Sequence, residues 1–123
     1  MCRVLIVDDS TSVRAMLRRT LSDGGHAVRE ARDGAEALLA LGDEVPDVVI
    51  TDVNMGEMDG ITLVRRIRER FPRSALPVLV LTTEASDELK ARGREAGATG
   101  WLVKPFDPVR IRAVLEHVTR KAS

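Results

Sequence analysis

Acidic side chains follow two apolar runs of the sequence, at the point where each run ends. Asp8 and Asp9 come directly after the run 3–7, and Asp52 comes directly after the run 48–51. Unbroken runs rich in β-branched residues are typical of strands buried on both faces of a parallel sheet. Ligands bind beside the carboxyl ends of such strands. If the two strands are neighbours, three carboxylates meet at one edge, and we expect Asp52 to accept a phosphoryl group there.

Such a cluster needs neutralisation, because two charges about 4 Å apart repel by roughly 4 kcal/mol at an effective dielectric constant near 20. One solution is a raised pKa for one carboxyl group. The other is a hard divalent cation, and Mg²⁺ typically takes one or two carboxylates together with phosphate oxygens. A plainer interpretation is that the acids only cap helices, since Asp9 and Ser10 precede a predicted helix. The presence of three acids at the ends of two strands favours a phosphate- or metal-binding site over the interpretation that these acids only cap helices.

Two later strands supply further groups to the same edge. Lys104 lies in the otherwise apolar run 101–106, and it either extends to solvent or is directed at nearby negative charge. Its place at a strand end favours the second interpretation. Thr82 ends the fourth predicted strand and offers a hydroxyl, although threonine is common in strands for packing alone. A carboxylate nucleophile, a cation and an ammonium group together suit phosphoryl transfer to an acid.

The elements that position these groups form a regular alternation of five apolar strands and five helices. The strands are predicted at 3–7, 26–31, 47–52, 77–81 and 101–103. Strands alternating with helices predict an α/β fold, a doubly wound parallel sheet covered on both faces with right-handed crossovers. We expect Met16 and Leu17 to face the core from the first helix, and Leu38 and Leu39 from the second. The fourth helix, predicted at 84–96, has Leu89 as its only large apolar residue.

Bulk properties restrict the class of protein. The 123 residues are enough for one domain, predicted at 1–123, and 19 basic residues balance 19 acidic ones, which argues against DNA binding by bulk charge. The single cysteine, Cys2, cannot form an internal disulfide, consistent with a reducing compartment. No signal peptide is evident, and no apolar run approaches the roughly 18 residues that span a bilayer. We expect a cytoplasmic monomer without membrane insertion.

Taken together, these residues resemble the receiver domains of two-component response regulators, and the resemblance covers the whole chain. Each motif alone is weak, but their order and spacing are specific. The motifs are Val7-Asp8-Asp9-Ser10, Ile50-Thr51-Asp52-Val53-Asn54-Met55, Met58-Asp59-Gly60, Leu81-Thr82-Thr83-Glu84-Ala85, Ala96-Gly97-Ala98 and Val103-Lys104-Pro105-Phe106. The resemblance implies the flavodoxin-like, five-stranded fold with strand order 2-1-3-4-5.

The resemblance also implies a phosphorylation site that contains Mg²⁺. A histidine kinase phosphorylates Asp52. The ion is bound by Asp9, Asp52 and the backbone carbonyl of Asn54, while Asp8 acts through a metal-bound water. Lys104 pairs with the acyl phosphate. The protein is then a phosphoacceptor that catalyses only its own phosphorylation and dephosphorylation, rather than an enzyme.

A conformational switch belongs to the same resemblance. Thr82 moves to hydrogen-bond the phosphoryl group, and the aromatic switch residue falls at Trp101, which turns inward when Thr82 moves. From the residues alone, the alternative is that Trp101 is an ordinary core residue. The Lys104-Pro105 peptide bond is expected to be cis, which costs little before proline.

Among receivers, the chain is most similar to the stand-alone CheY-like chemotaxis regulators. No output domain is expected within the chain, and Asn54 and Glu84 stand where the family controls how quickly phosphate is lost. The partners implied are a CheA-like histidine kinase and a downstream target such as the flagellar motor switch. A phosphorelay intermediate or a phosphate sink is the alternative.

The target-binding face is expected on the fourth helix, the fifth strand and the fifth helix. Five basic residues lie on these elements, although each one alone is consistent with an ordinary solvent-exposed charge. They are Lys90, Arg92, Arg94, Arg110 and Arg112.

Three positions depart from the family pattern. Gly56 replaces a frequent proline and is expected to loosen the loop beside the metal. Trp101 replaces tyrosine or phenylalanine, and its bulkier ring is expected to bias or slow the switch. Thr83 replaces a smaller residue and is expected to restrict access to the phosphate.

Three other functions are consistent with parts of the pattern. Phosphatases with an aspartyl nucleophile carry an acid two residues after it, where this chain has Asn54. A flavodoxin needs a phosphate-binding loop after the first strand, where Asp8 and Asp9 would repel the phosphate of FMN. A receiver that works unphosphorylated through a fixed surface is the third, and the complete set of site residues argues against it.

Overall fold

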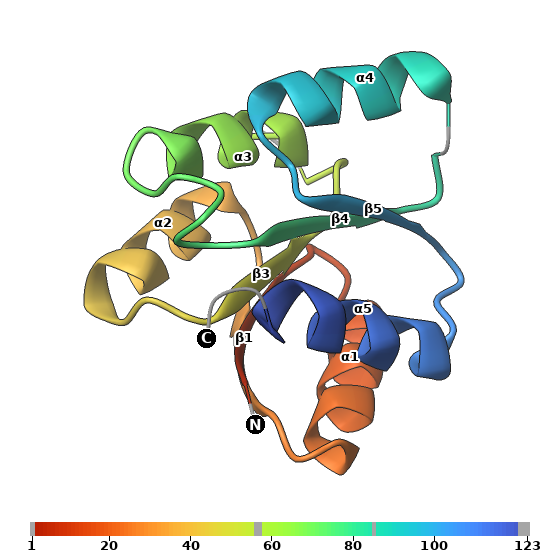
Figure 1. The fold of residues 1–123 in the computed structure, drawn as a ribbon. Helices are drawn as coiled ribbons and strands as arrows, with labels where there is room; N and C mark the ends of the chain where they lie inside the picture. Colours follow the sequence, from red (N-terminus) through yellow and green to blue (C-terminus); the bar gives the residue numbers. More distant parts are fainter. Residues whose placement is uncertain (1, 56–57, 85, 121–123) are drawn as a thin grey trace.

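The computed structural model describes residues 2–55, 58–84 and 86–120 (Figure 1). Within them, one parallel sheet has the strand order β2-β1-β3-β4-β5. Its strands are β1 (Arg3–Val7), β2 (Ala27–Ala31), β3 (Val48–Thr51), β4 (Val78–Thr82) and β5 (Gly100–Val103). The helices that alternate with them are α1 (Thr11–Asp23), α2 (Gly34–Asp43), α3 (Gly60–Arg68), α4 (Asp87–Ala96) and α5 (Pro108–Arg120). The predicted fold class and strand order are therefore confirmed.

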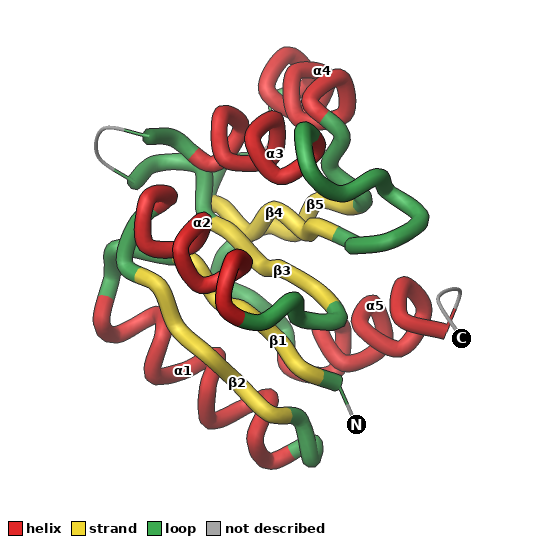
Figure 2. Tube along the Cα trace, turned by 90° about the vertical axis from the view of Figure 1, so that its left-hand side faces the viewer, coloured by secondary structure: helices red, strands yellow, loops and turns green. Residues whose placement is uncertain are grey.

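Helices cover both faces of the sheet, and the strands alternate their side chains between two cores (Figures 1 and 2). Leu5 and Val7 of β1 pack in the core beneath α2, α3 and α4. Val4 and Ile6 of the same strand pack in the core against α1 and α5. The central strands β3 and β4 are apolar up to their final threonines because both of their faces are buried. None of the helices in the described part of the chain is long and apolar enough to cross a bilayer.

The buried faces of the first two helices differ from the prediction. Met16 is 56 % exposed and Leu39 is 77 % exposed, so the expectation that both face the core was wrong. Leu17 is buried as predicted. The other buried residues include Arg14 and Leu21 in α1 and Ala37 and Leu41 in α2. Their spacings of three and four residues define each face, and Met16 and Leu39 lie outside those stripes. The unexpected member of the buried face of α1 is a charged residue, Arg14.

Polar caps begin four of the helices at the edge where the strands end. The side chains of Ser10, Asp33, Asp59 and Ser86 each accept a hydrogen bond from a backbone N–H in the first turn, at 2.7–3.2 Å. Such caps satisfy N–H groups that have no partner within the helix. They fix the start of each helix beside the carboxyl ends of the strands.

The side chain of Arg68 ties the far end of α3 to the chain segments around β4 and β5. Its guanidinium donates to the carbonyl oxygens of Gly97 at 2.9 Å, Phe71 at 3.2 Å and Leu76 at 2.6 Å. These carbonyls belong to turns and loops, so no backbone ladder satisfies them. A planar guanidinium spreads its donors over several nitrogens and meets all three, whereas the donors of a lysine lie on a single nitrogen.

We therefore expect Arg68→Lys to lower the free energy of unfolding by about 2 kcal/mol, because buried carbonyls lose charged donors. The matched control is Arg66→Lys on the same helix, whose side chain is 55 % exposed and lies 3.7 Å from Glu69. That change is expected to cost less than about 0.5 kcal/mol. Urea unfolding followed by circular dichroism measures both. Equal effects of the two substitutions would contradict the role assigned to Arg68.

Candidate functional site

Three carboxylates meet at the carboxyl edge of the sheet because β1 and β3 are neighbours. Val7 pairs with Thr51 at the ends of these strands, and the N–H of Asp52 donates to the carbonyl of Val7 at 2.9 Å. One carboxylate oxygen from each of Asp8, Asp9 and Asp52 lies within 4.8 Å of the others. Asp8 is 2 % and Asp52 is 8 % exposed, whereas Asp9 is exposed.

Both carboxylate oxygens of Asp8 have protein partners. Its Oδ1 accepts from the N–H of Ser10 at 2.9 Å, and its Oδ2 accepts from Nζ of Lys104 at 2.9 Å. Ser10 caps α1, so the alternative that Asp9 serves as the cap does not hold. Among the described residues, no hydrogen-bond or ion-pair partner engages the Asp9 carboxylate.

Lys104 points into the acidic cluster, with its side chain 15 % exposed. Its Nζ lies 2.9 Å from Asp8 Oδ2 and 3.4 Å from Asp52 Oδ2. The Lys104-Pro105 peptide bond is cis, as the resemblance implies. Burial by itself lowers the pKa of Lys104, but the hydrogen bond to Asp8 and the charges of both carboxylates raise that pKa above its ordinary value. The ammonium group is therefore a permanent positive charge in the site.

Asp52 is held as a buried carboxylate at the base of the cluster. Burial raises the pKa of Asp52 above its ordinary value, and the Asp8 charge adds to the rise; the charge of Lys104 and the N–H of Val53, at 2.8 Å, act against it. The net effect is a carboxylate whose ionised form is disfavoured in the fold. A positive charge bound beside the Asp52 carboxylate would favour its ionised form and lower its pKa.

The raised pKa predicts that Asp52→Asn stabilises the protein at neutral pH without divalent ions. A group whose pKa is higher in the folded state destabilises the fold when it is ionised, above its unfolded value of 3.8. As the pH falls through the folded pKa towards 3.8, the penalty disappears. The stability gain of the variant should therefore be present at pH 7 and shrink towards pH 4, as measured by urea unfolding in chelator. A variant less stable than wild type at pH 7 would contradict this.

A chain of polar contacts connects the mouth of the site to the indole of Trp101. Asn54 Nδ2 donates to Glu84 Oε1 at 3.2 Å, and Trp101 Nε1 donates to the Glu84 carbonyl at 3.2 Å. The N–H of Glu84 donates to the hydroxyl of Thr82 at 3.3 Å, and Thr82 is fully buried. Glu84 precedes α4, which begins at Asp87, so the predicted helix start at residue 84 was too early.

Trp101 is half-buried against α4, at a point where only a very small residue fits. A methyl group added to Gly93 would lie 2.7 Å from Cζ3 of the indole. The ring therefore lies against the helix backbone with its N–H at the loop before α4. The departures at the other two positions are less informative: Thr83 is exposed, and Gly56 lies outside the described residues.

The donor set of the acidic cluster suits a hard divalent cation. All the converging atoms are carboxylate oxygens, the ligands that Mg²⁺ and Ca²⁺ prefer. The single ammonium of Lys104 leaves the three acids with excess negative charge. The residues present therefore fit the metal that the family resemblance implies.

One residue close to the site was not predicted. Arg14 is 9 % exposed, and its guanidinium donates to the carbonyl of Asp8 at 2.6 Å. The signal for it was present, because residue 14 lies three and seven positions before Leu17 and Leu21. A charged residue in an apolar stripe needs a buried partner.

Comparisons with known proteins agree with this geometry. A model of the response regulator receiver domain family matches residues 4–116. The structure of the chemotaxis protein CheY4 of Vibrio cholerae is 47 % identical, with a TM-score of 0.90, and the match covers 96 % of this chain and 98 % of that one. A putative response regulator from Chloroflexus aurantiacus is 36 % identical, with a TM-score of 0.89, covering 97 % and 98 %.

Proteins about twice as long also match nearly the whole of this chain. The response regulator MprA of Mycobacterium sp. (strain KMS) is 40 % identical over 121 residues, which are 98 % of this chain and 52 % of that protein. The chain thus spans about half the length of the curated relatives it matches.

Proposed function

The chain belongs to the response regulator receiver domain family, and from that premise we propose that Asp52 is the residue that accepts the phosphoryl group. A receiver is a regulatory phosphoacceptor of a two-component system, partnered by a histidine kinase, and is not a true enzyme. The observation that carries the assignment is the convergence of Asp8, Asp9 and Asp52 within 4.8 Å, with Nζ of Lys104 3.4 Å from the Asp52 carboxylate.

The reaction is a displacement at phosphorus. A carboxylate oxygen of Asp52 attacks the phosphorus of a phosphohistidine, the P–O bond forms, and the P–N bond breaks with its electron pair returning to the imidazole. The ammonium of Lys104 offsets negative charge on the transferring oxygens. Asp8 holds this ammonium in place at 2.9 Å. Hydrolysis of the acyl phosphate returns Asp52 to its starting state.

The proposed metal is Mg²⁺, bound by Asp9, Asp52 and the backbone carbonyl of Asn54, with Asp8 acting through a water. When bound, the ion supplies positive charge to the oxygens of the phosphoryl group. The engagement of both Asp8 oxygens by Ser10 and Lys104 supports an indirect role for Asp8. The Asp9 carboxylate, which has no partner among the described residues, supports a direct one.

The proposed switch runs through the contacts of Glu84. A phosphoryl group on Asp52 draws the hydroxyl of Thr82, which now accepts from the N–H of Glu84 at 3.3 Å. Movement of Glu84 then releases or redirects Trp101, whose indole is held by the Glu84 carbonyl. Asn54 and Glu84, joined at 3.2 Å, lie at the mouth of the site and control the loss of phosphate.

Incubation with acetyl phosphate and Mg²⁺ tests the proposal. We expect intact-protein mass spectrometry to show one added phosphoryl group, absent with chelator present, and reversed as the protein dephosphorylates. A phosphorylated histidine kinase of the two-component class serves as the second donor. If neither donor labels the folded protein, the phosphoacceptor function is wrong.

The proposed output is a chemotaxis target, bound by the α4-β5-α5 face. The similarity to CheY4 over 98 % of that chain supports this choice, while a phosphorelay intermediate or a phosphate sink is the alternative. Flagellar switch proteins immobilised on a sensor should bind the beryllofluoride-activated protein and not the untreated one. Onward transfer of phosphate to a histidine phosphotransfer protein, without switch binding, would favour the relay.

A further inference from the structure

We propose that Arg14 is a positioning residue for the metal site: its guanidinium fixes the peptide between Asp8 and Asp9 and thereby sets the affinity for Mg²⁺. This inference rests on the metal site proposed above. In this proposal, a residue of α1 that the sequence analysis did not select orients the loop that carries Asp8 and Asp9.

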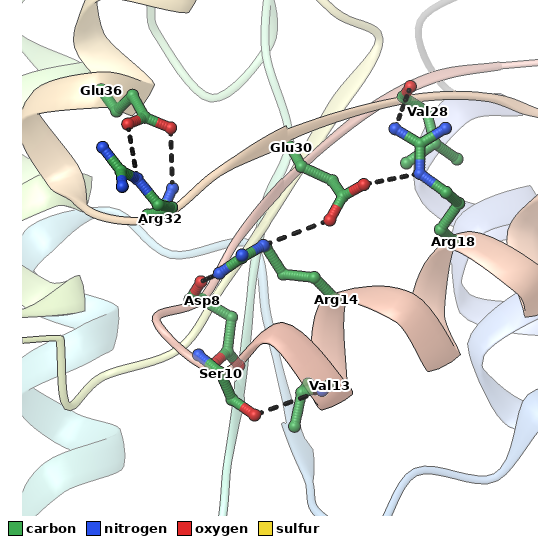
Figure 3. A network of polar contacts seen from close by, with 9 residues as sticks. All are labelled: Asp8, Ser10, Val13, Arg14, Arg18, Val28, Glu30, Arg32 and Glu36. Atoms are coloured by element: carbon green, nitrogen blue, oxygen red, sulfur yellow. Dashed lines mark hydrogen bonds and ion pairs between the residues drawn. The ribbon is translucent and has the colours of Figure 1, made fainter.

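The contact joins Arg14 to the backbone of the acidic loop and not to a carboxylate. The guanidinium donates to the carbonyl oxygen of Asp8 at 2.6 Å, as Figure 3 shows. This carbonyl belongs to the same peptide unit as the N–H of Asp9, so its direction determines where the Asp9 side chain projects. Because the carboxylate of Asp9 has no hydrogen-bond or ion-pair partner among the described residues, the position of its side chain depends on the orientation of the backbone that carries it.

Arg14 is itself held in place by a second anchor. Glu30 on β2 accepts from Nε of Arg14 at 3.1 Å and, through its other oxygen, from Nε of Arg18 at 2.6 Å. Arg18 in turn reaches the carbonyl of Val28 at 3.4 Å. The carboxylate of Glu30 thus lies between two arginines of α1 (Figure 3). The guanidinium of Arg14 is fixed from two sides, with little freedom to follow the loop.

The remaining contacts of Asp8 complete the same restraint. Its N–H donates to the carbonyl of Ala31 at 3.2 Å, and its carboxylate is occupied by Ser10 and Lys104. Removing Arg14 leaves the carbonyl of Asp8 without its donor while the other contacts persist. We therefore expect a variant without Arg14 to keep the fold, but its Asp9 side chain to be less ordered. Partners that orient metal ligands typically contribute ten- to a hundredfold in metal affinity.

The test measures the dissociation constant for Mg²⁺ by isothermal titration calorimetry, with no phosphodonor present. We expect Arg14→Ala to weaken binding about tenfold or more, and Arg14→Lys, which keeps one donor, to weaken it less. Arg18→Ala is the matched control, since it removes a partner of Glu30 from the same helix but leaves the contact to Asp8. Its affinity should equal that of wild type.

The controls separate positioning from general loss of stability. Arg68→Lys destabilises the opposite end of the molecule and should not change Mg²⁺ affinity. If Arg14→Ala does not fold, Arg14→Lys decides the question alone. Wild-type affinity in the Arg14 variants, or equal weakening in all variants, would overturn the inference while leaving the metal site intact. No binding by wild type would overturn the metal site and the inference together.

Discussion

An Asp52→Asn variant is expected to accept no phosphoryl group from acetyl phosphate or from a histidine kinase. The amide has no nucleophilic anion to form the acyl phosphate, yet it keeps the shape of the side chain and an oxygen for the N–H of Val53, which now donates at 2.8 Å. The variant should therefore fold, and by the argument from its pKa it should be more stable than wild type at pH 7. Phosphate incorporation should fall to background on intact-protein mass spectra.

The matched control is Asp59→Asn. Asp59 caps α3 through Thr62 at 2.7 Å, and asparagine caps helices as well as aspartate does. That variant should be labelled at the wild-type rate. If Asp52→Asn is labelled at more than background, another acid accepts the phosphoryl group. Peptide mapping of that product would then show whether Asp8 or Asp9 takes over.

The convergence of the acids was predictable because it follows from topology. Strands with unbroken apolar runs belong in the interior of a parallel sheet, and their carboxyl ends share an edge. Asp8 and Asp52 follow two such strands, so only the adjacency of β1 and β3 had to be assumed. The direction of Lys104 was predictable for a related reason, since its place at a strand end on the edge that holds the acids favours contact with their negative charge over extension to solvent.

The partners within the site were not predictable in the same way. Strand ends place side chains within several ångströms of each other, but which oxygen meets which donor depends on loop geometry. The shorter contact of Lys104 therefore goes to Asp8, at 2.9 Å, and the longer one to Asp52, at 3.4 Å. The wrong prediction for Met16 has a different cause, because a search for apolar side chains alone passes over Arg14, although its spacing from Leu17 and Leu21 places it in the buried stripe.

Gly60 shows how closely helix α3 approaches the proposed phosphoacceptor. It is the first residue of α3 and is buried, and its N–H donates to the carbonyl of Val53 at 2.7 Å. A Cβ atom at this position would overlap the carbonyl oxygen of Asp52 and lie 2.8 Å from its carbonyl carbon and 2.9 Å from Cα of Val53. All three atoms are backbone, so no side chain can rotate away. The glycine is required because of this close approach and not because of its φ angle.

Gly60→Ala is therefore expected to lower the free energy of unfolding by about 3 kcal/mol, the upper end of the usual cost of overpacking. The same substitution at Gly42 in α2, where a methyl group would meet nothing within 4 Å, should instead stabilise by up to about 1 kcal/mol through helix propensity. Urea unfolding in chelator measures both. The opposite signs separate close packing from helix propensity, because propensity alone predicts a gain at each position. A Gly60→Ala variant as stable as wild type would mean that α3 can withdraw from Asp52 at little cost, and that the backbone at the site is not fixed by this contact.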